Sequence, residues 1–219
     1  FAEENNSLLW KTSAGNSYSH RFFSGEQINK DNIKNLTKLW TFNSGSTAAL
    51  QTVQSPPVFI GNQLLVVTLK GDLISLSPIN GETLWKKKLA TPLGRRGFTY
   101  HESEDSELEG IYVASGTNIV QLNKNGEIKK KFLTGLSLVQ PFLDEKNLYV
   151  ATLRNGVKAF DLKTKKEIWS TSLKKNKVNA RVWSGFSFDK ETNSLFVVTS
   201  NPGGIIGENR SGDDFSASL

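Results

Sequence analysis

The chain has 219 residues, which is enough for one large or two small domains. It contains no cysteine, which excludes disulfides and thiolate metal sites, and it has no run of about 18 apolar residues long enough to span a membrane. The net charge of +6 comes largely from lysines in expected turns, which indicates a solvated surface and not a nucleic-acid partner.

The N-terminal part reads as a lead-in to a repeated structure. Residues 1–26 are polar, and residues 27–36 fit a short helix that Asn29 can cap, with Ile33 and Leu36 on one face. The segment KLWTF (38–42) then reads as a strand. Because the chain begins with Phe and not with Met, we expect a removed leader or an excerpt of a longer protein.

A repeat dominates the middle of the chain. Each copy has an alternating apolar strand, a turn, a second strand, a second turn and a third strand, and the copies begin near Leu64, Ile111, Leu148 and Leu195. Short antiparallel strands that recur about every 40 residues are typical of β-propeller blades. The sequence therefore predicts an all-β protein, a β-propeller of four-stranded antiparallel blades, with about four blades in this chain.

Two features of the repeat indicate how its strands are joined and packed. Asn80-Gly81 and Asn125-Gly126 are strong hairpin signals, because a two-residue type I′ turn needs positive φ at both central residues. Tryptophans stand in the third strand, where they are expected to pack between blades; Lys130 takes this place in the second full copy, and the tryptophans are Trp40, Trp85 and Trp169.

The last quarter of the chain differs from the repeat. An aromatic run from Trp183 to Asp189 precedes the strand LFVVTS (195–200), Asn201-Pro202 follows, and a loop then leads to Arg210, Gly212 and Asp213. This loop is too polar and too rich in glycine for a core segment.

These segments resemble the pyrroloquinoline quinone (PQQ) dehydrogenases. The clearest repeat, GVKAFDLKTKKEIW (156–169), is similar to the tryptophan-closed repeat of that family. Residues 16–42 resemble the lead-in to its first blade, and residues 182–218 resemble its motif of Trp, Asp, Asn-Pro and Arg-x-Gly-Asp. The resemblance covers nearly the whole chain and implies part of an eight-bladed propeller, with residues 1–219 as its N-terminal half.

The resemblance also implies a cofactor site. Family members hold PQQ over a calcium ion and oxidise an alcohol or a sugar, while the cofactor carries the hard chemistry. By position, Arg96 matches the arginine that pairs with PQQ carboxylates, Trp183 matches the tryptophan that stacks on the quinone, and Asn201 matches a calcium ligand. Gln54 stands where many members carry a glutamate that bonds to PQQ. The family's catalytic aspartate lies beyond Leu219, so no catalytic residue is expected within this chain.

The sequence departs from the family pattern at several of these positions. Thr91-Pro92 replaces the cysteine pair or histidine that gives the quinone its second stacking face, and Leu138 stands in place of a threonine. The loop after the strand LYVATL (148–153) is short, and the segment RNGVKAF (154–160) offers no counterpart of the calcium-binding carboxylate.

Each residue also has a simpler interpretation. Arg96 is then a solvated charge, Trp183 an inter-blade packing residue, and Asn201-Pro202 a turn after a strand. His20 and His101 lack a second ligand at useful spacing and are expected to be structural or exposed.

Two functions follow as alternatives. The first is a periplasmic PQQ-dependent dehydrogenase of alcohol or sugar, with a cytochrome or membrane quinone as electron acceptor. The second is a non-catalytic propeller of the same fold that acts as an envelope scaffold or protein-interaction module.

Overall fold

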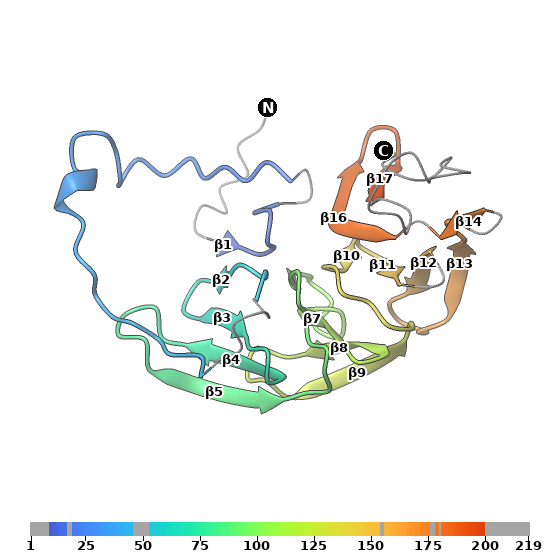
Figure 1. Cartoon of the computed structure of the whole chain (residues 1–219), viewed down its shortest axis with the longest axis horizontal. Helices are drawn as coiled ribbons and strands as arrows, with labels where there is room; N and C mark the ends of the chain where they lie inside the picture. Colours follow the sequence, from blue (N-terminus) through green and yellow to red (C-terminus); the bar gives the residue numbers. More distant parts are fainter. Residues whose placement is uncertain are drawn as a thin grey trace.

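A computed structural model describes residues 9–16, 19–45, 53–153, 156–175, 178–179 and 181–199 of the chain. The described part consists almost wholly of antiparallel sheets arranged around a common centre, as Figure 1 shows. This arrangement confirms the predicted all-β propeller architecture. No helix among the described residues is long and apolar enough to cross a membrane.

The first sheet has five strands in chain order from the centre outward. Consecutive strands pair antiparallel throughout. The strands are β1 (Leu9–Trp10), β2 (Val58–Ile60), β3 (Leu64–Val67), β4 (Asp72–Leu76) and β5 (Thr83–Lys88).

The second and third sheets have four strands each, again ordered from the centre outward. The second contains β6 (Thr99–His101), β7 (Gly110–Ser115), β8 (Asn118–Leu122) and β9 (Ile128–Leu133). The third contains β10 (Phe142–Leu143), β11 (Asn147–Thr152), β12 (Gly156–Asp161) and β13 (Glu167–Thr171).

Two further strand pairs follow the third sheet. The pair β16 (Val182–Asp189) and β17 (Ser194–Thr199) begins a fourth sheet, and a small ribbon, β14 (Lys174–Lys175) with β15 (Val178–Asn179), precedes it. The four repeat starts predicted from the sequence coincide, to within one residue, with the first residues of β3, β7, β11 and β17.

The core consists of three apolar layers between facing sheets. One layer joins the first and second sheets around Leu65 and Val113, and the next joins the second and third around Tyr112 and Leu148. A third layer, around Phe186, joins the third sheet to the β16–β17 pair. Each sheet thus buries its faces against its neighbours, as expected for blades that cannot bury them alone.

The outer strands confirm the predicted equivalence of Trp85, Lys130 and Trp169. Trp85 pairs with Ser75 in β4, Lys130 with Gln121 in β8, and Trp169 with Ala159 in β12. In all three sheets the register shifts immediately after this pair, which marks the same irregularity in each blade.

Two tryptophans bind the outer turn of the sheet that follows them in the chain. The Trp85 indole Nε1 donates to the Lys124 carbonyl at 2.8 Å, and the Trp40 Nε1 donates to the Pro78 carbonyl at 3.1 Å. Trp169 is 41% exposed and packs against Tyr149 of its own sheet. The predicted inter-blade role is therefore seen for Trp85, while Trp40 makes the equivalent contact from a segment that belongs to no described sheet.

The Asn-Gly turns do join hairpins, but they are not the two-residue type I′ turns that the sequence predicts. Only the glycines have positive φ, +74° at Gly81 and +81° at Gly126. Backbone hydrogen bonds close a loop of four residues after Ser77 and a loop of three residues after Asn123. The longer loops let the preceding asparagine keep the right-handed conformation that most residues prefer.

The lead-in differs from its prediction in two ways. The helix expected over 27–36 is reduced to one 3₁₀ turn, η1 (Ile33–Asn35), although the Asn29 side chain accepts from the backbone N–H groups of Asp31 and Asn32. Ile33 is 57% exposed, so no packing on its apolar face extends the helix. The strand expected over 38–42 is absent because no described strand pairs with it.

Residues 9–16 and 19–21, hereafter the N-terminal strap, contact the inner strands of the first, second and fourth sheets and the segment before β10 of the third. β1 pairs with β2, and the Tyr100 N–H donates to the Lys11 carbonyl at 2.8 Å. The Ser13 N–H donates to Gln140 Oε1 at 3.0 Å, and the Ser19 hydroxyl donates to the Phe186 carbonyl at 3.2 Å. The strap therefore links the sheets at the centre of the molecule.

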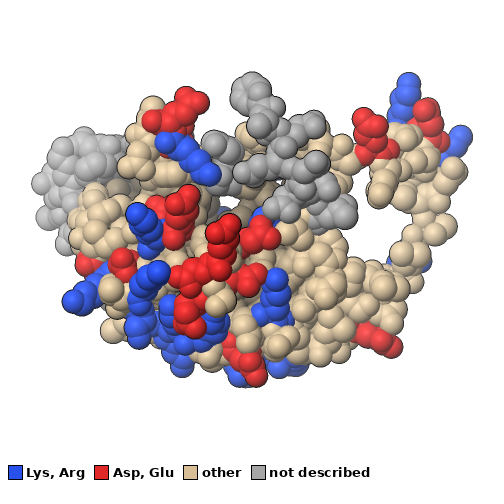
Figure 2. All heavy atoms as spheres, turned by 180° about the vertical axis from the view of Figure 1, so that it is seen from behind, with Lys and Arg blue, Asp and Glu red and all other residues tan. Residues whose placement is uncertain are grey.

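The surface charge is mixed on the face that Figure 2 shows, where acidic and basic side chains alternate without a region of one sign. Lysines form ion pairs with acids of the loop between β6 and β7, including Lys124 with Glu109 and Lys163 with Asp105, both at 2.9 Å. The net positive charge is thus partly balanced by neighbouring acids.

Candidate cofactor site

Two of the residues singled out in the sequence, Arg96 and Trp183, are in direct contact. The Arg96 guanidinium carbon lies 3.9 Å from the centre of the Trp183 ring, over its face. The same guanidinium donates from Nη1 to the Trp183 carbonyl at 2.9 Å. The contact joins the turn before β6 to the start of β16, so it links the second sheet to the fourth.

The backbone around Arg96 is fixed by neighbouring sheets. The Arg96 N–H donates to the Leu138 carbonyl at 3.0 Å, and residues 96 and 139 form an isolated parallel bridge. Gly97 has φ of +130°, and a β-carbon on it would lie 2.9 Å from Ser13 Oγ. Glycine is required here because the conformation and the close approach both exclude a larger residue.

Gln54 lies next to this turn. The Gln54 backbone N–H donates to the Arg95 carbonyl at 3.2 Å, and Gln54 as a whole is exposed to solvent. Leu138 contributes its carbonyl to Arg96, which the sequence pattern did not predict. Thr91-Pro92 precedes the turn, and the Pro92 carbonyl accepts from Gly116 at the end of β7. The structure thus brings Gln54, Arg96 and Trp183 to one end of the inner strands.

Asn201, the predicted calcium ligand, lies outside the described residues, as does the loop with Arg210 and Asp213. Within the described ranges, no three His, Cys, Asp or Glu side chains are grouped closely enough to hold a metal ion.

The electrostatics of the site are those of a cation pair. Burial, and after it the charge of Arg95, lower the pKa of the Arg96 guanidinium. The Nε atoms of Arg95 and Arg96 are both buried and have no hydrogen-bond partner in the described structure.

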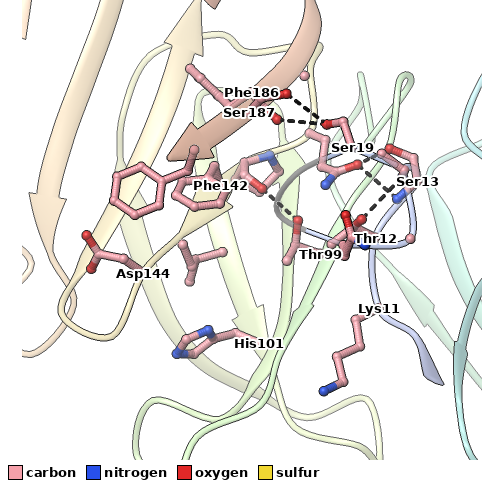
Figure 3. A pocket seen from close by; sticks show the side chains of 18 of the residues that line it. Lys11, Thr12, Ser13, Ser19, Thr99, His101, Phe142, Asp144, Phe186 and Ser187 are labelled. Carbon is pink, nitrogen blue, oxygen red and sulfur yellow. Dashed lines mark hydrogen bonds between the residues drawn. The ribbon is translucent and has the colours of Figure 1, made fainter. Parts of the chain in front are cut away.

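A cavity of about 1020 Å³ extends along the inner strands, and neither Arg96 nor Trp183 is among the described residues that line it. Gln140, Ser184 and Gly185 line it, and Gly97 contacts the Ser13–Gln140 pair at its edge. Figure 3 shows Ser13 and Ser19 of the strap on one side of the cavity and Phe142 and Asp144 toward the other. Hydroxyl and amide groups dominate the end closest to the strap.

The other end of the cavity contains His101 and Asp144. The His101 Nε2 atom is buried without a partner in the described structure, and desolvation lowers the pKa of the imidazole. Asp144 accepts from the Tyr149 hydroxyl at 2.8 Å; burial, and then this bond, raise the pKa of Tyr149 to about 12. His101 is half-buried and His20 is exposed, consistent with their predicted structural or exposed roles.

Sequence reasoning did not find the strap or the cavity. The residues concerned, such as Ser13, Ser19 and Gln140, have common polar side chains without a motif. Their partners lie 127 to 168 residues away in the chain, a separation that local patterns do not reveal.

Comparison with known proteins identifies relatives. The family model described as "Glucose/ethanol/alcohol dehydrogenase, beta-propeller domain" matches residues 10–135. The quinoprotein glucose dehydrogenase A of Acinetobacter calcoaceticus is 31% identical over 108 residues, 44% of this chain and 13% of that protein. The quinate/shikimate dehydrogenase (quinone) of Acinetobacter baylyi is 23% identical over 133 residues, 57% of this chain and 16% of that protein.

Solved structures show the same fold. A europium-containing methanol dehydrogenase superposes with a TM-score of 0.74 at 18% identity, over 97% of this chain and 46% of that one. The quinohemoprotein alcohol dehydrogenase from Comamonas testosteroni superposes with a TM-score of 0.72 at 17% sequence identity. The match covers 90% of this chain and 36% of that one. The chain thus spans less than half the length of these relatives. Since the family model covers more than half of the chain and both comparisons agree with the resemblance of its motifs, the chain belongs to the glucose/ethanol/alcohol dehydrogenase β-propeller family of PQQ-repeat proteins.

Proposed function

We propose that this chain forms the cofactor-binding side of a PQQ-dependent dehydrogenase that oxidises an alcohol or a sugar. The contact between Arg96 and Trp183 carries the proposal. These residues are 87 positions apart, on different sheets, and each was assigned to PQQ from its own motif. Their meeting at one end of the inner strands, with Gln54 close by, is what a shared site requires.

The described residues fit the acidic groups of PQQ. A guanidinium can pair with a carboxylate through two parallel hydrogen bonds, and the buried Arg96 Nε atom has no partner among the described residues. Trp183 is 41% exposed, so its indole can take a flat ring by offset stacking. The guanidinium now lies over one indole face, so a ring would stack on the other face or displace the guanidinium toward a ligand carboxylate.

The roles of the chain's own residues follow from this fit. PQQ, when bound, supplies a two-electron acceptor for the oxidation of a CH–OH group. Arg96 would hold a carboxylate and set the orientation of the ring plane. Trp183 would support the ring, and the bond from Arg96 to its carbonyl would keep the indole in place. Gln54 would offer a neutral amide where a glutamate is usual in the family.

A calcium ion is part of the proposal, with Asn201 as one oxygen ligand. Arg96 and Trp183 would contact the cofactor, and no group of three His, Cys, Asp or Glu among the described residues is placed to hold the cation. We further propose a periplasmic location and a cytochrome or membrane quinone as electron acceptor. These proposals rest on the family.

The second candidate is a non-catalytic propeller that serves as a scaffold. One observation favours it: the Arg96 guanidinium already has a ring beneath it and an acceptor for Nη1. Such a contact stabilises two sheets without any ligand, because a cation over an indole is attracted by its π face.

Fluorescence titration separates the two functions. PQQ added to the intact protein with calcium should quench tryptophan emission saturably, and Trp183→Ala should lose most of this quench. Trp169→Phe is the matched control, because Trp169 is also 41% exposed in a strand. If the unmodified protein shows no saturable quench at any calcium concentration, the dehydrogenase proposal fails and the scaffold stands.

A further inference from the structure

Arg95 has a feature that the proposed function does not use. Its Nε atom is buried and has no partner in the described structure, as is also true of its neighbour Arg96. Two consecutive arginines on a solvated surface would normally direct these atoms to water. A buried donor without an acceptor is unfavourable, so an explanation is needed.

Backbone hydrogen bonds hold the turn that carries the two consecutive arginines. The Arg95 carbonyl accepts from Gln54, the Arg96 N–H donates to Leu138, and the Gly97 N–H returns to the Gly94 carbonyl at 3.0 Å. The turn is thus fixed on both sides and cannot readily rearrange to separate the charges. Their mutual repulsion contributes to lowering the pKa of Arg96.

No described carboxylate compensates for this pair. All seven ion pairs among the described residues use lysine, and neither Arg95 nor Arg96 takes part in one. Gln54, whose backbone bonds to Arg95, is neutral. Two adjacent positive charges, partly buried and without an acid, favour the binding of an anion.

We propose that Arg95 is the second guanidinium of an anion site, in which Arg95 and Arg96 together bind a planar aromatic ligand with at least two carboxylates. The inference rests on the proposed function for Trp183 as the platform of the ring. It extends that function because it assigns a binding role to Arg95 and states why the ligand must carry more than one acid group. Each guanidinium fork matches one carboxylate, so a monocarboxylate leaves one fork unpaired.

The test compares charge variants of the intact protein by PQQ titration. Arg95→Gln should weaken PQQ binding about tenfold or more, because one hydrogen-bonded ion pair is lost. Lys131→Gln removes an exposed charge from β9 and is the matched control, with unchanged affinity expected. Arg95→Lys keeps the charge without the planar fork and should weaken binding by a smaller factor.

Two simple probes test the choice of ligand separately from PQQ. The unmodified protein should bind benzene-1,3-dicarboxylate more tightly than benzoate, and Arg95→Gln should remove this preference. If Arg95→Gln keeps both the original PQQ affinity and the original preference, Arg95 is a solvated charge and the inference is wrong. Should Arg95→Gln fail to fold, the same criterion applies to Arg95→Lys.

The outcomes also separate this inference from the proposed function. If PQQ does not bind but the dicarboxylate preference is present and depends on Arg95, the anion site stands and PQQ is the wrong ligand. If PQQ binds and Arg95 has no effect, the proposed function stands alone. If neither PQQ nor either probe binds, both are wrong.

Discussion

Gly81 and Gly126 occupy the same place at two successive outer turns, each beneath a tryptophan ring. A β-carbon on Gly126 would lie 2.6 Å from the Trp85 ring, and one on Gly81 would lie 2.6 Å from the Trp40 ring. Both glycines also have positive φ. The turn and the tryptophan of the preceding segment therefore require each other.

Gly126→Ala should lower the free energy of unfolding by two separate effects. The left-handed backbone costs about 1–2 kcal/mol for a residue with a β-carbon. The clash with Trp85 adds about 1–3 kcal/mol, as overpacking generally does. Denaturant unfolding of the intact protein measures the sum.

Gly61→Ala is the control for that measurement. Gly61 has φ of +88°, but its β-carbon would meet nothing closer than Leu9 at 3.7 Å. Gly61→Ala should therefore lower the free energy of unfolding by the cost of the left-handed backbone alone. Equal losses for the two variants would contradict a specific role of the Trp85 contact.

His101 predicts a dependence of stability on pH. Burial lowers the pKa of the folded imidazole below its ordinary value of 6.5, so below this value the unfolded chain binds more protons than the folded one. Stability is thus fully present above pH 6.5 and falls as the pH decreases. His101→Gln should flatten the slope of the unfolding free energy between about pH 7 and 5; an unchanged slope would assign the decrease to other groups.

At the scale of elements, the N-terminal strap contacts the first, second and fourth sheets and the segment before β10 of the third. It adds a strand to the first sheet and reaches the second through the Lys11 carbonyl. The third is reached through Gln140 and the fourth through Ser19. The strap also packs against Gly97, so its position affects the turn that carries Arg96.

Gln140→Ala should loosen the strap. The substitution leaves the Ser13 N–H and hydroxyl without their shared acceptor, which costs about 1–3 kcal/mol for a buried group and less where water enters. Faster trypsin cleavage after Lys11, together with a lower melting temperature, would be the expected result.

Gln27→Ala provides a comparison in the exposed lead-in. Only the backbone carbonyl of Gln27 has a described hydrogen bond, so its side chain can be removed without loss. A cleavage rate for Gln140→Ala equal to that of Gln27→Ala would show that the Ser13–Gln140 contact does not hold the strap.

At the scale of the whole molecule, local patterns accounted for the blades and not for what lies between them. Alternation of apolar residues identified strands such as β3 and β11, because their apolar side chains are buried against neighbouring sheets. The equivalence of Trp85 and Trp169 followed from the repeat. The helix at Ile33 was predicted too long, and the strand predicted around Trp40 is absent, because propensity was taken without a packing partner.

The site shows the same division. Arg96 and Trp183 came from motifs, and the fold shows that they are in contact. Gln140 and Arg95 belong to no motif. Gln140 is notable because its partner Ser13 is distant in sequence, and Arg95 because its buried Nε has no partner among the described residues. A chain read without its fold cannot show that a donor is buried and unpaired.

The exposed face of β17 leads to a prediction about association. Phe196 and Val198, two positions apart on the same face, are 49% and 42% exposed. Expressed by itself, the chain should self-associate with increasing concentration, because such faces seek partners. Sedimentation should show less association for a variant with Phe196→Ser and Val198→Thr. A monodisperse, unmodified monomer at all concentrations would contradict this expectation.

The contacts of the strap have a consequence for the order in which the protein is made. Ser19 precedes its partners Phe186 and Ser187 by 167 and 168 residues. On the ribosome, strands β2 to β5 of the first sheet can pair in chain order long before β16 is synthesised, but Ser19 must wait for that strand. Contacts over such separations form slowly, since the loop-closure entropy is lost before they contribute. The strap is therefore translated before the sheets it joins, yet it can complete its contacts only after the last of them has emerged.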